Sequence, residues 1–520
     1  MIYSIEILKG ECFFGGSVKD SLKMPFDSNS DFSCDLRTDG ISNQTMPILL
    51  STKGRYIWSE EPFKFTFKNG KIIIEGNSVS VNESGETLKD AYKAAMEAHF
   101  PFDGRHLCET FFKKEQFNSW MQFMYNPTQE GILSYANKII ENGYEPGILI
   151  IDEGWQIDYG TWKFDPYKFP DPQKMCKELH GLGFRIMLWV VPYVSCSGYY
   201  YQEYTRFHPD SDNLFLRNDN GEISIVNWWN GNTAMLDFTK ECDCRFLQKQ
   251  LDELIDNFGI DGFKFDGGTY YSYSDMSVIN GKHSPDITPD MRNNAWNDFG
   301  RKYEYHEYKD SYRQAGKNMI QRLCDRYHSW GDEGISSIVI SSAVQGLLGT
   351  PFICPDMIGG GEWSSFKFEL NSVVDEELFV RMAQSSAFLP MMQFSLAPWE
   401  VLNEENQKSV LKVARLHRSL SDYILKLVKA SEKSGEPIVR HLAYDYPDEG
   451  FEYCNDCFML GERYLVAPVL TKGVTERTLV LPKGKWRYVS GQIFDGGKVT
   501  VSAELDTLPY FEKCIEFEEK

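Results

Sequence analysis

The stretch Asp261-Gly262-Phe263-Lys264-Phe265-Asp266-Gly267-Gly268 predicts one buried strand of a parallel sheet. Phe263 and Phe265 alternate with Lys264, and the run stops at Asp266, before two glycines. In barrels of alternating strands and helices, a carboxylate at the carboxyl end of a strand commonly belongs to the active site. An aspartate before Gly-Gly is also an ordinary way to leave a strand. The octapeptide alone leaves both interpretations open.

Apolar strands alternate with amphipathic helices on both sides of this stretch, from about residue 110 onward. Near-continuous apolar strands of this kind predict a parallel sheet covered by helices. Polar residues at the strand ends favour an α/β fold of the (β/α)8 TIM-barrel type. We expect strands at 119–125, 147–152, 184–192, 261–266, 319–324, 352–354 and 389–394, with an eighth unassigned, and helices at 87–99, 128–142, 171–183, 241–258 and 402–433.

Two all-β regions flank the predicted barrel. Residues 1–105 hold short alternating runs between turn residues, which predicts an N-terminal β-sandwich, and Asn69-Gly70 predicts a hairpin turn within it. Short strands return after residue 433. The sequence therefore predicts three domains: an N-terminal β-sandwich at 1–105, a catalytic barrel at 106–433 and a C-terminal β-sandwich at 434–520.

The composition of the chain limits the classes of partner that it is expected to bind. A net charge of −21 over 520 residues disfavours nucleic acid and anionic membranes, because both bind basic surfaces. We expect no membrane span, since no apolar run reaches about 18 residues. We also expect no leader segment, since the first residues reach the acidic Glu6 without an apolar core. Twelve scattered cysteines, with one C-x-x-C at Cys454 and Cys457, favour a reduced cytoplasmic protein without a metal site. The acidic surface allows a homo-oligomer without requiring one.

Acidic residues follow several predicted strands. They are Asp152 and Glu153, then Asp266, Asp325 and Asp356. Folding alone does not account for them, because each added acid increases repulsion at a crowded rim. Carboxylates in this arrangement serve either metal binding, as in Mg²⁺-dependent barrels, or cleavage of a glycosidic bond by a carboxylate pair.

Aromatic residues favour the glycosidic alternative, because flat rings pack well against the C–H faces of sugars and metal sites have no use for many indoles. Lys264, two residues before Asp266, points to the same face of its strand. It is expected either to keep Asp266 ionised or to form an ion pair inside the barrel. The tryptophans at or near predicted strand ends are Trp120, Trp155, Trp189, Trp228, Trp229, Trp330, Trp363 and Trp399.

Residues 261–266 resemble the nucleophile motif of glycoside hydrolase family 31. The likeness continues in family order over about residues 110–500, through the segments 151–156, 188–192, 227–231, 322–330, 349–360, 392–395 and 465–470. Trp228-Trp229-Asn230-Gly231 and the segments around 355–360 and 392–395 resemble the α-galactosidase-like branch that includes the myogenesis-regulating glycosidase.

The resemblance implies a retaining, exo-acting α-glycosidase with Asp266 as nucleophile and Asp325 as general acid/base. Asp332 is a rival for the second role, since Gly331-Asp332 matches a family signature superficially. Asp325 is favoured because it directly ends an apolar strand and its spacing to Asp356 suits the family. We expect a raised pKa at Asp325 from burial and from the charge of Asp266. We also expect Arg322 to point away from Asp325, because pairing would lower that pKa.

The resemblance further implies a substrate-binding set, for which strand-end capping and core packing are the alternatives: Asp152, Glu153, Trp189, Trp229, Lys264, Arg322 and Asp356. No metal and no cofactor is needed. The partner is an oligosaccharide or glycoside that carries a terminal α-linked hexose. Departures from the α-glucosidase pattern at Glu153 and around Asp356 favour galactose. An α-glucosidase or α-xylosidase and a non-catalytic sugar-binding protein are the alternatives.

Overall fold

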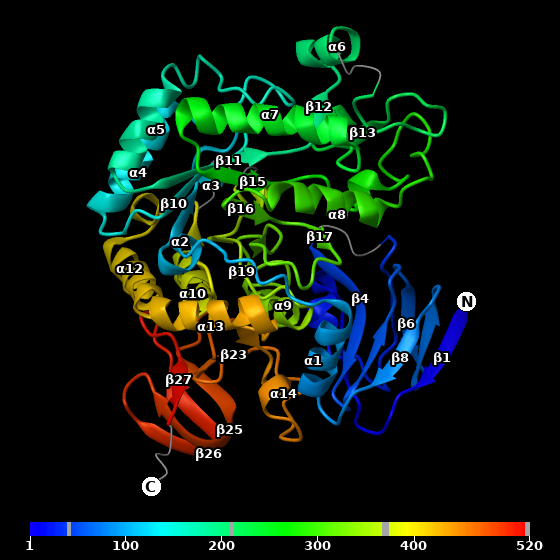
Figure 1. Cartoon of the computed structure of the whole chain (residues 1–520). Helices are drawn as coiled ribbons and strands as arrows, with labels where there is room; N and C mark the ends of the chain where they lie inside the picture. The colour runs from blue at the N-terminus through cyan, green and yellow to red at the C-terminus, as the bar shows by residue number, and fades with distance from the viewer. Residues whose placement is uncertain (39–42, 209–212, 367–373, 515–520) are drawn as a thin grey trace.

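The computed structural model describes residues 1–38, 43–208, 213–366 and 374–514 (Figure 1). At its centre lies the predicted TIM barrel. Its neighbouring strands all pair in parallel within the described ranges. In barrel order they are β9 (Gln116–Asn118), β10 (Ile148–Ile151), β11 (Arg185–Val190), β15 (Gly262–Phe265), β16 (Tyr305–Tyr308), β18 (Gln321–Arg322), β19 (Ile353–Cys354) with β20 (Met357–Ile358), and β21 (Gln393–Phe394).

The seventh barrel strand is interrupted. Its first half, β19, pairs with β18, and its second half, β20, pairs with β21, which in turn pairs with β9. Pro355 and Asp356 lie between the halves, and Asp356 has a φ of 86°, in the left-handed region that side chains disfavour. The two halves together close the barrel, and Asp356 lies at the break between them.

Helices cover the outside of the barrel (Figure 1). The predicted helices at 128–142, 171–183 and 241–258 are confirmed, and the region 402–433 divides into two helices at Leu420. The longer helices of the barrel region are α4 (Gln129–Glu141), α5 (Pro172–Gly181), α7 (Glu241–Phe258), α8 (Pro289–Gly300), α9 (Ile338–Leu347), α10 (Glu376–Ser386), α12 (Glu404–Ser419) and α13 (Ser421–Ser434).

The strand predicted at 119–125 is wrong. The chain leaves β9 after three residues and forms the short helix α3 (Trp120–Phe123). Asn118 Oδ1 accepts a hydrogen bond from the backbone N–H of Trp120 at 2.8 Å, and Ser395 Oγ accepts one from Met121 at 2.7 Å. These bonds take the N–H groups out of a strand ladder, so the apolar run turns as a helix.

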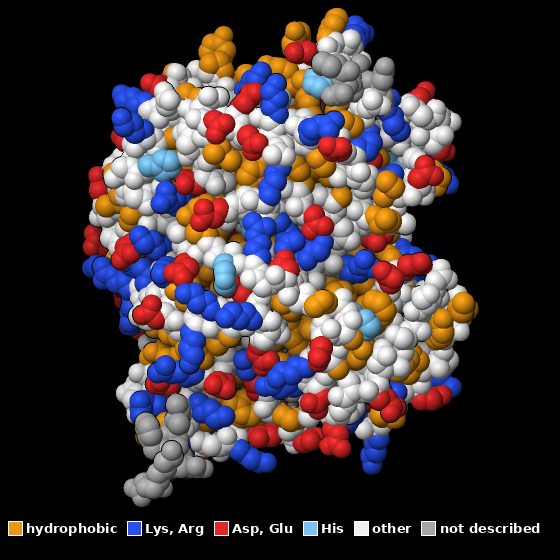
Figure 2. Space-filling model, in the orientation of Figure 1, with side chains coloured by type: hydrophobic (Ala, Val, Ile, Leu, Met, Phe, Trp, Pro, Cys, Tyr) orange, Lys and Arg blue, Asp and Glu red, His pale blue; other side chains and the backbone are white. Residues whose placement is uncertain are grey.

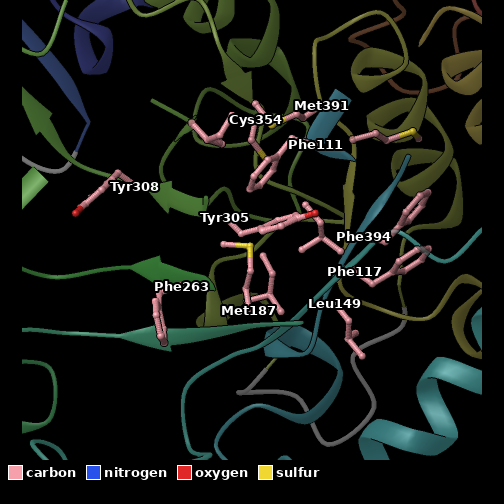
Figure 3. Close-up of a cluster of buried hydrophobic side chains, with 14 of the residues drawn as sticks. Phe111, Phe117, Leu149, Met187, Phe263, Tyr305, Tyr308, Cys354, Met391 and Phe394 are labelled. Atoms are coloured by element: carbon pink, nitrogen blue, oxygen red, sulfur yellow. The ribbon is translucent and has the colours of Figure 1, made fainter. Parts of the chain in front are cut away.

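Side chains along β15 alternate as predicted. Phe263 and Phe265 are buried on the outer face of the barrel, where Phe265 packs on Trp296 of α8 at a centroid distance of 5.2 Å. Lys264 points inward. Figure 3 shows Phe263 among the buried apolar side chains contributed by neighbouring strands, including Leu149 and Met187. These contacts hold β15 in place, with Lys264 directed into the barrel.

The N-terminal region forms two packed sheets, and the predicted hairpin at Asn69-Gly70 joins β6 to β7. Strand β17 (Ser311–Tyr312), which follows β16 in the barrel, pairs with β4, so barrel and sandwich share a sheet. One sheet contains β1 (Ile2–Glu6), β7 (Lys71–Glu75), β6 (Lys64–Lys68) and β3 (Phe32–Asp35), and the other contains β17, β4 (Gln44–Ser51), β5 (Arg55–Trp58), β8 (Ser80–Glu83) and β2 (Phe13–Ser17).

The C-terminal region is mainly β, as predicted, and also contains the short helix α14 (Leu442–Asp445). Its described strands form one six-stranded antiparallel sheet, in the order β22 (Val439–Arg440), β23 (Phe458–Leu460), β24 (Tyr464–Val466), β27 (Tyr510–Lys513), β25 (Glu476–Tyr488) and β26 (Ile493–Ser502). A small sheet of β12 (Tyr193–Ser195), β14 (Gly231–Met235) and β13 (Ile225–Trp228) is inserted after β11.

Basic and acidic side chains are interspersed on the face of the molecule drawn in Figure 2, despite the net charge of −21. Within the described ranges, every helix falls short of the length and apolar content that a membrane span requires.

Candidate active site

A cavity of about 500 Å³ lies at the carboxyl ends of the barrel strands. It collects most of the residues that the sequence singled out, together with Lys309 and Glu362, which it did not. Four of the eight strand-end tryptophans belong to its wall. The lining residues are Trp120, Tyr125, Asp152, Glu153, Trp189, Trp229, Asn230, Lys264, Asp266, Lys309, Asp325, Gly361, Glu362 and Trp363.

The two aspartates of the opening stretch lie at opposite ends of β15 and do different things. Asp261, at the amino end, accepts a hydrogen bond from the backbone N–H of Ile186 at 2.7 Å and contacts His180 Nε2 at 2.8 Å. Asp261 therefore joins the start of β15 to the neighbouring strand β11, away from the cavity. Asp266, at the carboxyl end, lines the cavity, which is where barrel enzymes bind their substrates.

Asp266 is held as an oriented carboxylate. The Trp189 indole donates to Oδ2 at 3.1 Å, the Gly267 N–H donates to Oδ1 at 2.8 Å, and Lys309 Nζ lies 3.2 Å from Oδ1. Burial alone would raise the pKa of Asp266, but the charges of Lys309 and Lys264 outweigh it and hold the pKa below its usual value. The carboxylate is therefore ionised at neutral pH.

Asp325 lies beside Asp266, and two expectations about it are wrong. Arg322 Nη1 pairs with its Oδ1 at 2.9 Å instead of pointing away, and Lys309 Nζ lies 3.2 Å from its Oδ2. Burial favours protonation of Asp325, but Lys309 and Arg322 lower its pKa below the usual value. Without a ligand, Asp325 is thus an anion and not the protonated acid expected from the sequence. Its side chain is 26% exposed.

Lys309 is the residue in contact with both carboxylates, and the sequence did not single it out. It directly follows β16, the strand that stayed unassigned. Its ammonium bridges Asp266 and Asp325, and both carboxylates raise the lysine pKa despite burial. Tyr305-His306-Glu307-Tyr308 gave no clear strand signal, because His306 and Glu307 interrupt the apolar run that marked the other strands.

Lys264 pairs first with Asp152. Its Nζ lies 2.6 Å from Asp152 Oδ2, and each side chain is 4% exposed. The expected interior ion pair is therefore present, with Asp152 as the partner. The influence of Lys264 on Asp266 is electrostatic and smaller than that of Lys309. Both members of the pair line the cavity, so their remaining hydrogen-bonding capacity faces it.

Glu153 accepts three hydrogen bonds on one oxygen. Tyr159 OH donates to Oε1 at 2.5 Å, Asn230 Nδ2 at 2.7 Å and the Trp229 indole at 3.2 Å. Burial raises the pKa of Glu153 to about 7, against the lowering effect of the Tyr159 and Trp229 bonds. Through these bonds Glu153 anchors the β13–β14 hairpin, which carries Trp229, over the cavity.

Asp356 does not line the cavity with the other predicted site residues. Arg322 Nη1 contacts its Oδ1, while the backbone N–H groups of Arg326 and Gly361 donate to Oδ2 at 2.8 and 3.1 Å. Burial raises the pKa of Asp356 to about 6, although Arg322 opposes the shift. Arg322 also lies 3.5 Å from Glu307 and is itself 1% exposed. Arg322 and Asp356 therefore support the site from positions behind the cavity wall.

Asp332 lies on an exposed turn, where Ser336 Oγ donates to its Oδ1 at 3.4 Å. It is absent from the cavity wall. Of the two rivals, the structure brings Asp325, and not Asp332, to Asp266.

One group of described residues has metal-ligand spacing. Cys454, Asp456 and Cys457 offer ligand atoms within 4.8 Å of one another. Arg477 Nη2 lies 2.5 Å from Asp456 and 3.7 Å from Cys457 Sγ, so a guanidinium already compensates this group. It lies in the C-terminal region, apart from the cavity.

The chain matches the family model of the glycosyl hydrolases family 31 TIM-barrel domain over residues 114–427 and of the family's C-terminal domain over 435–514. It is 31% identical to the myogenesis-regulating glycosidase of Mus musculus over 447 residues, which is 82% of this chain and 60% of that protein. It is 26% identical to alpha-glucosidase 2 of Bacillus thermoamyloliquefaciens over 416 residues, 74% of this chain and 50% of that protein.

The chain thus spans about half to three fifths of the length of these relatives. Among solved structures, the dextranase of Flavobacterium johnsoniae complexed with glucose shares the fold. Its TM-score is 0.82 at 18% identity, with 98% of this chain and 66% of that chain covered. Because the family's TIM-barrel model matches more than half of the chain, the chain belongs to glycosyl hydrolase family 31.

Proposed function

We propose that the chain is a retaining, exo-acting α-glycoside hydrolase that releases a terminal α-linked hexose, with galactose as the first candidate. The spacing of Asp266 and Asp325 carries this proposal. Both carboxylates contact the same ammonium at 3.2 Å, so the two contacting oxygens are at most twice 3.2 Å, or about 6.4 Å, apart. This limit admits the separation of about 5–5.5 Å between the carboxyl groups of retaining enzymes, whereas inverting enzymes need about 6.5–9.5 Å to admit a water. The resemblance of residues 261–266 to a nucleophile motif adds the argument for retention.

The proposed reaction is a double displacement. Asp266 attacks the anomeric carbon, the bond to the glycosidic oxygen breaks, and Asp325 donates its proton to the leaving oxygen. Asp325 then removes a proton from water, which attacks the anomeric carbon and releases Asp266. The hydrogen bonds from Trp189 and Gly267 hold Asp266 in one orientation for the first step.

The pocket wall supports a sugar in the deepest part of the cavity. The Asp152–Lys264 pair offers both acceptors and donors to hydroxyl groups, and hydrogen bonds to charged groups contribute about 1.5–3 kcal/mol each. Trp229, which is 53% exposed, offers a flat face at the mouth, whereas Trp189 lines the cavity but is only 1% exposed. These residues are the proposed glycone contacts, with Glu153 holding the Trp229 hairpin above them.

Galactose is preferred because the 227–231 segment resembles the α-galactosidase-like branch of the family. Relatives named as glucosidases favour glucose as the second candidate. A panel of 4-nitrophenyl α-glycosides of galactose, glucose and xylose separates these. Faster hydrolysis of the glucoside than of the galactoside reverses the preference.

The catalytic role is tested by Asp266→Asn. The variant should lose turnover by about 10³-fold or more while circular dichroism shows an intact fold. Wild-type product, followed by NMR immediately after cleavage, should be the α-anomer, as retention requires. A β-anomer contradicts the retaining mechanism. An active Asp266→Asn variant contradicts the nucleophile, and sugar binding without any turnover favours the non-catalytic alternative.

A further inference from the structure

The ammonium of Lys309 occupies the space between the two carboxylates. It lies 3.2 Å from Asp266 Oδ1 and 3.2 Å from Asp325 Oδ2, and its side chain is 14% exposed. In the proposed displacement the anomeric carbon must lie against Asp266 and the glycosidic oxygen against Asp325. Lys309 and the reacting atoms of the substrate therefore need the same space.

We infer that Lys309 is a displaceable counter-ion: an α-glycoside that enters the cavity replaces its ammonium between Asp266 and Asp325, and Asp325 then takes up one proton from solvent. This inference rests on the proposed function. It assigns to Lys309 a positioning role, because the residue sets the protonation of Asp325 and has to leave before bonds change.

The Trp229 indole gives the displaced ammonium of Lys309 an alternative contact. Its Nζ already lies 6.0 Å from the centre of the Trp229 indole, at the outer limit of a cation–π contact. A lysine has four rotatable methylene links, so rotation toward Trp229 separates the ammonium from both carboxylates without moving β16. Trp229 lies at the cavity mouth, and a displaced ammonium there stays partly hydrated.

The charges around Asp325 explain why a proton follows. With Lys309 in place, cations outweigh burial at Asp325. Once the ammonium leaves and a sugar excludes water, burial and the unscreened charge of Asp266 both favour the protonated form. Arg322 stays beside Asp325 and opposes this change, but its charge is shared with Asp356 and Glu307. The charged groups that act on Asp325, or on which it acts, are Lys309 from β16, Arg322 from β18, Lys264 and Asp266 from β15, and Asp356 between β19 and β20.

The direct test is a crystal structure of the full chain soaked with galactose and, separately, with glucose. We expect a bound hexose and a Lys309 ammonium that is beyond hydrogen-bond distance of both Asp266 and Asp325. A bound sugar beside an unmoved Lys309 overturns the inference alone. A cavity that admits neither sugar overturns it together with the proposed function.

The kinetic test is the pH dependence of kcat/KM in Lys309→Met and Lys309→Arg. Removing the cation should move the whole bell-shaped profile to higher pH by about one to three units, because both carboxylates lose a counter-charge. Lys309→Arg, which keeps the charge, should retain the wild-type profile, as should Lys249→Met, a control at an exposed lysine of α7. A profile unchanged in Lys309→Met overturns the inference, since loss of mere packing would lower activity without moving the profile.

Discussion

Gln44 of the N-terminal sandwich donates a hydrogen bond of 3.0 Å from its Nε2 to the backbone carbonyl of Arg322 in the barrel. The same nitrogen donates to the carbonyl of Lys309 at 2.8 Å. Beside it, Asn43 Oδ1 accepts a bond from the N–H of Cys324 at 3.2 Å. The sandwich therefore holds the ends of β16 and β18, which carry Lys309, between the two carboxylates, and Arg322, beside Asp325.

Gln44→Ala should lower kcat by about tenfold with a smaller change in KM. Loss of both bonds frees two strand ends, and displacements well below 1 Å at catalytic groups reduce rates strongly. The lost bonds should also reduce stability by about 1 kcal/mol each. Steady-state kinetics on the preferred 4-nitrophenyl glycoside, with Tm measured on the same preparations, checks both effects.

Ser21→Ala is the matched control for Gln44→Ala. Ser21 Oγ lies 2.9 Å from Ser341 Oγ of α9, so this variant also removes a buried bond between the sandwich and the barrel, but not one to β16 or β18. It should lower Tm modestly and leave kcat unchanged. Equal losses of kcat in both variants would mean that Gln44 acts only through general stability.

Asp325→Asn should reduce hydrolysis of a methyl α-glycoside by about 10²–10⁴-fold, the usual contribution of a general acid. The loss on the 4-nitrophenyl glycoside should be smaller at the glycosylation step, because nitrophenolate leaves without protonation. Asp332→Asn should stay within about twofold of wild type on both substrates, since Asp332 lies exposed outside the cavity. The reverse pattern would assign the acid/base role to Asp332.

The barrel, its flanking β regions and most strand-end carboxylates were predictable because those signals are local. A buried parallel strand reads as an apolar run, and its terminal acid follows within one or two residues. The apolar run at 119–125 satisfied the same rule and was wrong, since short runs do not distinguish a strand from a helix. There, Asn118 and Ser395 decide the outcome through hydrogen bonds to the backbone.

The pairing of charges inside the site was not predictable in this way. Lys264 meets Asp152, 112 positions away, because β15 and β10 both flank β11 and their register brings the side chains together. Lys309 reaches both carboxylates because β16 lies between β15 and β18. Such contacts depend on strand order and register, which a single sequence does not state.

The raised pKa of Glu153 makes stability depend on pH. Its pKa is about 7 in the folded chain, against 4.5 for an ordinary glutamate, so the folded state binds the extra proton between these values. The contribution of Glu153 to the free energy of unfolding is complete below about pH 4.5 and is lost as the pH rises to about 7. Glu153→Gln does not titrate, and its Oε1 can still accept the bonds from Tyr159, Asn230 and Trp229.

The difference in Tm between Glu153→Gln and wild type should therefore grow in favour of the variant from pH 5 to pH 8. The expected free-energy change is on the order of 1–3 kcal/mol, since each pKa unit corresponds to about 1.4 kcal/mol. Glu97→Gln, at an exposed position of the helix Leu88–His99, should show no such trend. A constant difference for Glu153→Gln across this range would show that Glu153 is ionised in the folded protein at pH 5.

Gly268→Ala should destabilise the protein by about 2–5 kcal/mol and disturb Asp266, two residues earlier. The backbone at Gly268 has a φ of +57°, which costs an alanine about 1–2 kcal/mol, and its Cβ would lie 2.5 Å from Cδ1 of the fully buried Trp296, adding an overpacking cost of about 1–3 kcal/mol. Gly473→Ala separates these causes, because Gly473 has a φ of +74° and nothing within 4 Å of a Cβ. Calorimetric Tm values and kcat should fall much further for Gly268→Ala than for Gly473→Ala. Equal small losses would mean that Trp296 and α8 can move, and that the close packing behind the glycine pair does not hold Asp266 in place.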